Sequence, residues 1–190
     1  MHDKAYYYGL NTIARNDTLN FLNNRIKKDG GAVEWDGTEL ASISDEAIEY
    51  AETEWPKYYS NSEDSHQGFS KAWSSIWYHT NLQPSNFNLA IWQKLNGNKV
   101  LQGLAVGKTS EGKEHLTLNW VERNFGPQYH RFGILIPTLM CFERYASLLG
   151  CKRVLIKNPI DPSKYTRYGY KSFPVSKSIT NFLAKEIPNG

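Results

Sequence analysis

The pattern of apolar and polar positions changes character near residue 85. Before it, apolar residues at spacings of three and four predict a helix over residues 66–80, and start and stop signals predict helices over 18–28 and 44–55. Asp17 is placed to cap the helix 18–28, and Gly30-Gly31 to end it. Residues 32–35 predict one short strand. The first part of the chain is therefore expected to be mostly helical.

After Pro84 the apolar runs have the length and composition of strands. Such runs occupy residues 88–95, 100–106 and 115–121. Asn96-Gly97 is a strong hairpin signal between the first two runs, and Gly112 marks a turn before the third. Because each connection is short, we expect these runs to form an antiparallel meander.

The next stretch predicts a crossover connection. Residues 135–149 carry an apolar stripe at helical spacing, with Pro137 in the first turn and Gly150 directly after the last residue. Residues 154–156 follow as a short apolar strand. Strand, helix and strand joined this closely form a βαβ unit, so this strand is expected to lie parallel to the run 115–121.

Residues 162–170 predict a short helix that Gly169 ends, and residues 171–175 a last strand. The fold class that follows is α/β. It consists of a mixed sheet, an antiparallel meander plus one parallel βαβ crossover, with a helical N-terminal part.

Size and composition restrict the class of protein. A chain of 190 residues fits one domain. No apolar run approaches the roughly 20 residues of a membrane-spanning helix, and the first residues lack the apolar core of a signal peptide. The two cysteines, Cys141 and Cys151, are expected to be buried thiols of a reducing compartment. We therefore expect a cytoplasmic protein without membrane association.

Charge is distributed unequally along the chain. Residues 1–85 hold seven Lys/Arg and thirteen Asp/Glu, a balance of −6, whereas residues 86–190 hold fifteen and six, a balance of +9. This asymmetry suggests two different partners or two ends of one site, with ordinary solvated charge as the alternative.

The sequence HRFGIL, residues 130–135, lies where the meander ends and the crossover helix begins. The unpaired N–H groups and positive dipole end of a helix N-terminus hold phosphate well. Gly133 would let a phosphate approach the backbone closely. This turn is therefore a candidate phosphate-binding site, and an ordinary loop is the alternative.

This order of elements resembles the GNAT acyltransferase superfamily. The signature turn of that family, R/Q-x-x-G-x-G/A after a proline, is similar to FGPQYHRFGIL, residues 125–135. Pro127 stands at the proline, His130 at the Arg/Gln position and Gly133 at the first glycine. Downstream, YTRYGY (165–170) matches the family's Y-x-K/R-x-G-F/Y stretch without a gap, and Asn158-Pro159 before it looks typical. The resemblance covers about residues 85–175.

The resemblance implies acetyl-CoA as the acyl donor and an amine as the acceptor. It implies a single domain over residues 1–190: an acidic, helical, acceptor-side part (1–85), an acyl-CoA-binding core (86–175) and a C-terminal tail (176–190). In the family, backbone N–H groups of the signature turn hold the coenzyme A pyrophosphate, and the pantetheine arm lies on the preceding strand. The implied coenzyme A residues are Trp120, Val121, Phe125, His130, Arg131, Phe132, Gly133, Ile134, Leu135 and Asn158. Tyr165 is implied as the general acid that protonates the leaving thiolate.

Two positions depart from the family pattern. Leu135 stands where the second Gly or Ala belongs, and His130 is charged only part of the time near neutral pH. A GNAT-like binding module without catalytic activity is therefore the main alternative to an N-acetyltransferase. The basic second half favours a multiply charged anion such as coenzyme A; its candidate cations are Arg123, Arg131, Lys157, Lys164 and Arg167.

Acylation of an amine needs the amine unprotonated, so a base is expected. Glu122 is the first candidate because it is the carboxylate nearest the central strand, followed by Glu114 and His115. The alternative for Glu122 is a solvated residue at a strand bulge.

The acceptor is suggested only by the first half of the chain. Its carboxylates occur together with aromatic residues such as Trp35, Trp55, Trp73 and Trp77, a combination that suits a cationic ligand. We therefore expect an amine acceptor that is a cationic small molecule or a protein. The alternative is a pair of helices whose aromatic residues are core and whose acids are solvated.

Other classes find less support in the sequence. The five histidines show no metal-ligand spacing, and no metal is expected. No G-x-S-x-G, Walker or dinucleotide-binding motif occurs. The cations of the second half are scattered rather than aligned on one helix, which makes nucleic acid an improbable partner. A homodimer is left open.

Overall fold

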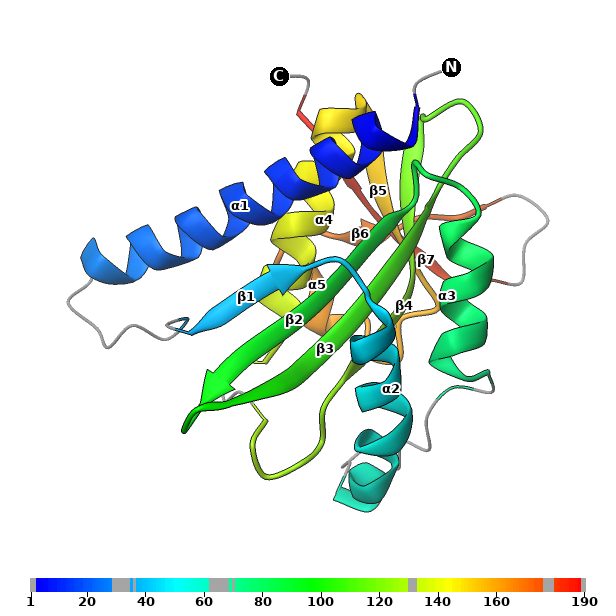
Figure 1. The fold of residues 1–190 in the computed structure, drawn as a ribbon. Coiled ribbons are helices and arrows are strands. Elements are labelled where there is room, and N and C mark those ends of the chain that lie inside the picture. The colour runs from blue at the N-terminus through cyan, green and yellow to red at the C-terminus, as the bar shows by residue number, and fades with distance from the viewer. Residues whose placement is uncertain are drawn as a thin grey trace.

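The computed structural model describes residues 3–28, 35, 37–61, 69, 71–129, 133–175 and 180–188. Within these residues a mixed sheet separates two layers of helices (Figure 1). Helices α1 and α4 pack against each other on one face, and α2 and α3 lie on the other. The expected α/β fold with a mixed sheet is confirmed.

The helices are α1 (Lys4–Lys28), α2 (Asp45–Thr53), the 3-10 helix η1 (Trp55–Asn61), α3 (Trp73–Asn81), α4 (Leu135–Leu149) and α5 (Ser163–Thr166). The strands are β1 (Thr38–Ala41), β2 (Phe87–Leu95), β3 (Asn98–Thr109), β4 (His115–Arg123), β5 (Arg153–Lys157), β6 (Lys171–Ser172) and β7 (Phe182–Glu186). Their order in the sheet is β1-β2-β3-β4-β5-β7-β6. No helix of the described residues is long and apolar enough to cross a membrane.

The meander and the crossover lie where the sequence predicts them. Strands β2, β3 and β4 pair antiparallel, and β4 pairs parallel with β5 after α4 crosses between them. Asn96 and Gly97 have φ angles of 49° and 83°, the left-handed pair that a tight hairpin turn needs. Gly150, with φ of 78°, ends α4 and donates its N–H to Ala146 and Ser147 carbonyls. Local turn chemistry therefore fixes this half of the sheet.

The C-terminal end differs from the prediction. The expected last strand, residues 171–175, is only the two-residue β6, and β7 follows it within the segment expected to be a tail. Strand β7 inserts between β5 and β6 and pairs antiparallel with both. Short strands of mixed polarity are stabilised by their neighbours rather than by their own propensity, which is why the sequence pattern did not reveal β7.

Helix α1 begins fourteen residues before the predicted start at Thr18, because it runs from Lys4. Its buried face contains Asn11, Arg15 and Thr18, which hide the apolar periodicity. Asp17 lies inside the helix and forms a 2.7 Å ion pair with Arg144 of α4 instead of capping. The predicted end at Lys28 is confirmed, and Gly30-Gly31 lies outside the described residues.

The remaining N-terminal elements match in part. The predicted helix 44–55 is present as α2, which Ser44 caps, because its side chain accepts the N–H of Ala47. Helix α3 begins only at Trp73, and the predicted residues 66–68 and 70 lie outside the described residues. Of the predicted strand 32–35 only Trp35 is described; it precedes a turn, and β1 follows that turn.

Candidate active site

The site is built around a division in the sheet. Strand β4 pairs with β5 only from His115 to Leu118, although β4 continues to Arg123. At the same point the register with β3 shifts, so that Asn119 has no cross-strand partner and forms a bulge. The Asn119 side chain accepts the backbone N–H of Lys108 at 3.1 Å, which holds the bulge in place. The last part of β4 consequently diverges from β5.

The N-terminus of α4 follows this division in the chain. Gly133 has a φ of 71°, and Ile134 occupies the cap position without a side-chain hydrogen bond. The first turn contains no acidic residue, and Pro137 has no N–H of its own. Among the described residues, no side chain caps the remaining N–H groups of this turn, and groups of this kind can bind an anion.

Aromatic side chains pack close to Gly133. The Arg123 guanidinium lies 4.6 Å from the ring centre of Phe125 and 4.5 Å from that of Tyr129. A Cβ added at Gly133 would lie 3.0 Å from the Tyr129 hydroxyl, so a side chain there would meet both strain and crowding. His130, Arg131 and Phe132, three of the coenzyme residues expected from the sequence, lie outside the described residues.

Glu122 is buried, with 3% of its surface exposed, so it is not the solvated bulge residue of the alternative interpretation. The indole N–H of Trp73 donates to its carboxylate, and the Tyr59 hydroxyl forms a second hydrogen bond with it. Burial, followed by the charge and hydrogen bond of Glu122, raises the pKa of Tyr59 above its ordinary value, so Tyr59 stays protonated and donates. The carboxylate on β4 is thus held by η1 and α3.

The other residues expected on β4 point to different sides of the sheet. Trp120 packs with the core under α2 and α3, whereas Val121 packs with the core under α4. Phe125 lies between the Arg123 guanidinium and the Tyr59 ring, whose centre is 6.2 Å away. Leu135 is half-buried against the α4 core. The structure therefore places Val121 and Leu135 against one core and Trp120 against the other, on opposite faces of the sheet.

Tyr165 lies on α5 and packs against the same α4 core as Val121 and Leu135. Burial, and to a smaller extent the charge of Asp161, raises its pKa, so its hydroxyl is protonated at neutral pH. Tyr170, at the end of the YTRYGY stretch, is buried and donates its hydroxyl to Glu143 of α4 at 3.0 Å. The stretch therefore combines a tyrosine that packs against the α4 core with one that anchors the stretch to α4.

Asn158 has a local structural role in this structure. Its φ of 49° places it in a left-handed turn after β5. Its backbone N–H donates to the Asn181 carbonyl at 2.8 Å, and its side-chain oxygen accepts the Asn181 N–H at 3.1 Å. These bonds tie β5 to the start of β7. A contact of Asn158 with coenzyme A stays a prediction.

The two secondary base candidates lie at the opposite end of β4. Glu114 is exposed and pairs with Lys152 at 3.2 Å, and His115 is opposite Arg153 in the parallel register. Seven strand residues separate His115 from Glu122, roughly 23 Å along an extended chain. Neither side chain is therefore close to Glu122.

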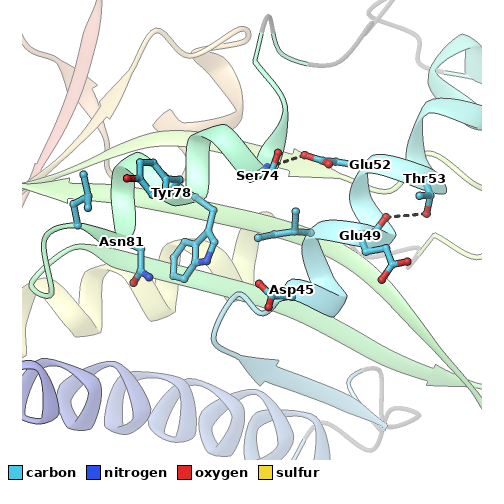
Figure 2. A pocket seen from close by; sticks show the side chains of 10 residues that line it. Asp45, Glu49, Glu52, Thr53, Ser74, Tyr78 and Asn81 are labelled. Atoms are coloured by element: carbon cyan, nitrogen blue, oxygen red, sulfur yellow. Dashed lines mark hydrogen bonds between the residues drawn. The ribbon is translucent and has the colours of Figure 1, made fainter.

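The described residues line two grooves of opposite charge. The first, with a volume of about 590 Å³, lies between α2 and α3 and is lined by Asp45, Glu49, Glu52, Trp77 and Tyr78 among others. In Figure 2 the carboxylate of Glu52 accepts the backbone N–H of Ser74, a 2.7 Å bond that joins the two helices. The second groove, of about 510 Å³, lies over β4 and β5 and is lined by basic residues. Neither groove contains a group of three or more potential metal ligands among the described residues.

Several of these features had weak signals in the sequence. The partners of Glu122, Trp73 and Tyr59, come from helical segments about 50 and 60 residues away, and no spacing rule links them. A bulge at Asn119 is visible only from the strand register. The clustering of Lys108, Arg153 and Lys157 likewise depends on which strands are neighbours.

No family model and no curated protein sequence matches this chain. Many solved structures share its fold. Ard1 from Thermoplasma volcanium superposes with a TM-score of 0.56 at 13% identity, over 80% of this chain and 98% of that one. The ribosomal-protein-S18-alanine N-acetyltransferase from Escherichia coli gives 0.52 at 13% identity, over 79% and 94%.

The structure of yncA from Salmonella typhimurium with its cofactor acetyl-CoA gives a TM-score of 0.52 at 10% identity, over 82% of this chain and 96% of that one. At these identities the likeness concerns the fold. Together with the strand order, the βαβ crossover and the divergence of β4 from β5, it establishes that the chain has the GNAT fold.

Proposed function

We propose that this protein is an acyl-CoA-dependent N-acyltransferase that moves an acetyl group from acetyl-CoA directly to an amine. The observation that carries the proposal is the position of the uncapped N-terminus of α4 beside the diverging end of β4. The first feature suits a pyrophosphate, and the second leaves a stretch of β4 edge that β5 does not pair with, which suits an extended amide-bearing arm.

The residues present fit coenzyme A. The backbone of Gly133, Ile134 and Leu135 would hold the pyrophosphate, since the left-handed glycine keeps Cβ atoms away from it. Leu135 has only its N–H to contribute, so its side chain in place of Gly or Ala is compatible with this role. His130, Arg131 and Phe132 complete the turn in the sequence. Trp120, Val121 and Phe125 would flank the pantetheine arm.

The chemistry requires one bond exchange. The amine nitrogen attacks the thioester carbonyl, the C–S bond breaks as the C–N bond forms, and the thiolate takes up a proton. We assign the proton donor to Tyr165, whose hydroxyl remains protonated because burial raises its pKa. We assign removal of the amine proton to Glu122. Because Glu122 is enclosed by Trp73 and Tyr59, the proton would reach it through a water molecule or through the Tyr59 hydroxyl.

The acceptor is proposed to be an amine that is cationic in water. The groove between α2 and α3 supports this, since it combines Asp45, Glu49 and Glu52 with the aromatic rings of Trp77 and Tyr78. A thermal-shift panel of amines and matched alcohols, with acetyl-CoA present, would test the acceptor class. Stabilisation by amines alone supports it, and equal effects of alcohols contradict it.

We place the protein in the cytoplasm, where acetyl-CoA is available and thiols stay reduced. Both cysteines are free and buried in the structure, which accords with a reducing compartment. A homodimer remains a prediction, and light scattering of the purified chain would decide it.

Calorimetric titration with acetyl-CoA tests the central claim. We expect micromolar binding by the wild type and its loss in Gly133→Glu, because a side chain and a negative charge would enter the anion site. Gly112→Glu is the matched control, since Gly112 lies in an exposed turn with its nearest side-chain atom 3.7 Å from an added Cβ. Equal affinity of both variants and the wild type would contradict the assigned site.

Catalysis is tested separately with Tyr165→Phe. Loss of a general acid lowers kcat by about 10²- to 10⁴-fold while the affinity for acetyl-CoA is retained. Tyr168→Phe is the control, because Tyr168 lies in the same segment and its ring contacts Arg167 at 4.8 Å. A chain that binds acetyl-CoA but acetylates no amine of the panel would be the GNAT-like binding module instead.

A further inference from the structure

The groove over β4 and β5, here called the basic groove, differs in charge from the rest of the site. Its charged and titratable lining residues are Lys108, His115, Arg153 and Lys157. None of the described residues that line it is acidic. We propose that the basic groove binds an anionic group, a carboxylate or a phosphate, that is part of the amine acceptor. This inference rests on the proposed function and specifies its acceptor.

The cations of the groove are available to a ligand. Among the described residues, no carboxylate lies within ion-pair distance of Lys108 or Lys157. Arg153 pairs with the exposed Glu186 at 3.2 Å, at the strand end, and lies 5.2 Å from the Phe173 ring centre. An anion entering the groove would therefore meet two unneutralised ammonium groups and one partly neutralised guanidinium.

The pKa of His115 depends on the burial and the charges around the groove. Burial, and next the positive charge of Arg153, lowers its pKa, while Glu114 acts weakly in the opposite direction. Glu114 is itself paired with Lys152. The imidazole is therefore neutral at neutral pH and can donate or accept one hydrogen bond to a ligand.

The groove reaches the reactive part of the site. Asn119 lines it, and Asn119 is the bulge at which β4 begins to diverge from β5. The Lys108 ammonium lies 5.6 Å from the ring centre of Trp120, the next residue along β4. A ligand held by Lys108 and Lys157 would thus extend toward the divergence where the thioester is proposed to lie.

The dimensions and walls of the groove suit a small molecule. Its volume of about 510 Å³ falls in the range of small-ligand pockets, roughly 300–1,000 Å³. Phe173 and Phe182 add apolar surface to one wall. The acceptor that suits this placement is an amine bearing a carboxylate or phosphate, with its anionic end in the basic groove and its amine end directed toward the diverging end of β4.

Anion binding is measured first on the full chain without acetyl-CoA. Inorganic phosphate and succinate are the two probes, and the NMR pH titration of the His115 ring is the signal. We expect bound anion to raise the pKa of His115 by about one unit, as a nearby opposite charge does. Which probe gives the larger effect distinguishes a phosphate from a carboxylate ligand.

Lys108→Gln/Lys157→Gln should abolish this effect. Neither lysine forms an ion pair with a described residue, so the substitutions break no ion pair among these residues. Lys71→Gln/Lys94→Gln, which removes the same charge from two exposed sites outside the groove, should retain the effect. No response of His115 in the wild type, or an equal response in both double variants, would overturn the proposal.

Acetylation of matched amine pairs then tests the acceptor class. Ethanolamine is compared with phosphoethanolamine, and tyramine with tyrosine. We expect kcat/KM to be about tenfold higher for the anionic member of at least one pair, the value of one good charge-assisted hydrogen bond. The preference should disappear in Lys108→Gln/Lys157→Gln. Preference for the neutral-tailed members overturns the proposal, whereas failure of the acetyl-CoA titration with an intact His115 response overturns only the proposed function.

Discussion

The contact between Gly103 and Ile134 connects the stability of the sheet to the start of α4. Gly103 lies on β3, and Ile134 is the buried cap residue of α4. A Cβ added at Gly103 would lie 2.5 Å from Cδ1 and 2.9 Å from Cγ2 of Ile134, and 3.2 Å from the Glu122 carbonyl oxygen. The first contact can be relieved by rotating χ2, but the second involves an atom fixed by χ1.

Gly103→Ala should therefore lower the free energy of unfolding by about 1–3 kcal/mol, the usual cost of overpacking. This loss outweighs the gain of about 0.5–1 kcal/mol that alanine normally brings to a strand interior. Ile134→Ala alone should cost about 2–5 kcal/mol, because it empties a buried site. Urea unfolding followed by tryptophan fluorescence gives both free energies.

The double variant Gly103→Ala/Ile134→Ala is the decisive measurement. It removes both crowded atoms, so we expect it to be more stable than the sum of the single changes implies, by about 1–3 kcal/mol. Gly112→Ala, whose added Cβ would make only an ordinary 3.7 Å contact, serves as the control and should be neutral. If the two single changes are additive, the claim that a side chain at position 103 clashes with Ile134 is refuted.

Three further predictions concern other parts of the fold. Gly97→Ala should cost about 1–2 kcal/mol in urea unfolding, since its φ of 83° is unfavourable for alanine although the space around it is open; an unchanged midpoint would contradict this. Burial raises the pKa of Cys141 to about 12 and that of Cys151 to about 11, so both thiols should react with a disulfide reagent far more slowly in the native protein than in urea. Burial also raises the pKa of Tyr59 and Tyr170, so stability should hold below about pH 10 and fall as the pH rises further, because the unfolded chain loses these protons first. Urea midpoints measured across that range check the sign, and a rise in stability would contradict it.

The sequence determined the elements whose signals are local. The left-handed turn at Asn96-Gly97, the cap at Ser44 and the glycine that ends α4 are all decided by residues within a few positions of each other. The apolar runs that flank them gave the meander, and the short return after α4 gave the parallel pairing of β4 and β5. These signals sufficed for the fold class and for the location of the Gly133 turn.

Tertiary packing decided the elements with polar or weak patterns. The buried face of α1 includes Asn11, Arg15 and Thr18, so its first half showed no apolar periodicity. Strand β7 exists because β5 and β6 pair with it on both sides. In both cases the stabilising partner lies far away in the chain, and a local pattern carries no information about it.

In the candidate site, too, some features were predicted from the sequence and others were found only in the folded chain. The sequence alone located the turn at Gly133 and named Glu122 and Tyr165. Only the folded chain placed Trp73 and Tyr59 on the Glu122 carboxylate, and only strand register gathered the basic groove. Helix ends and tight turns are set by hydrogen bonds between near neighbours, whereas burial, pKa and charge clustering depend on which distant segments the sheet brings together.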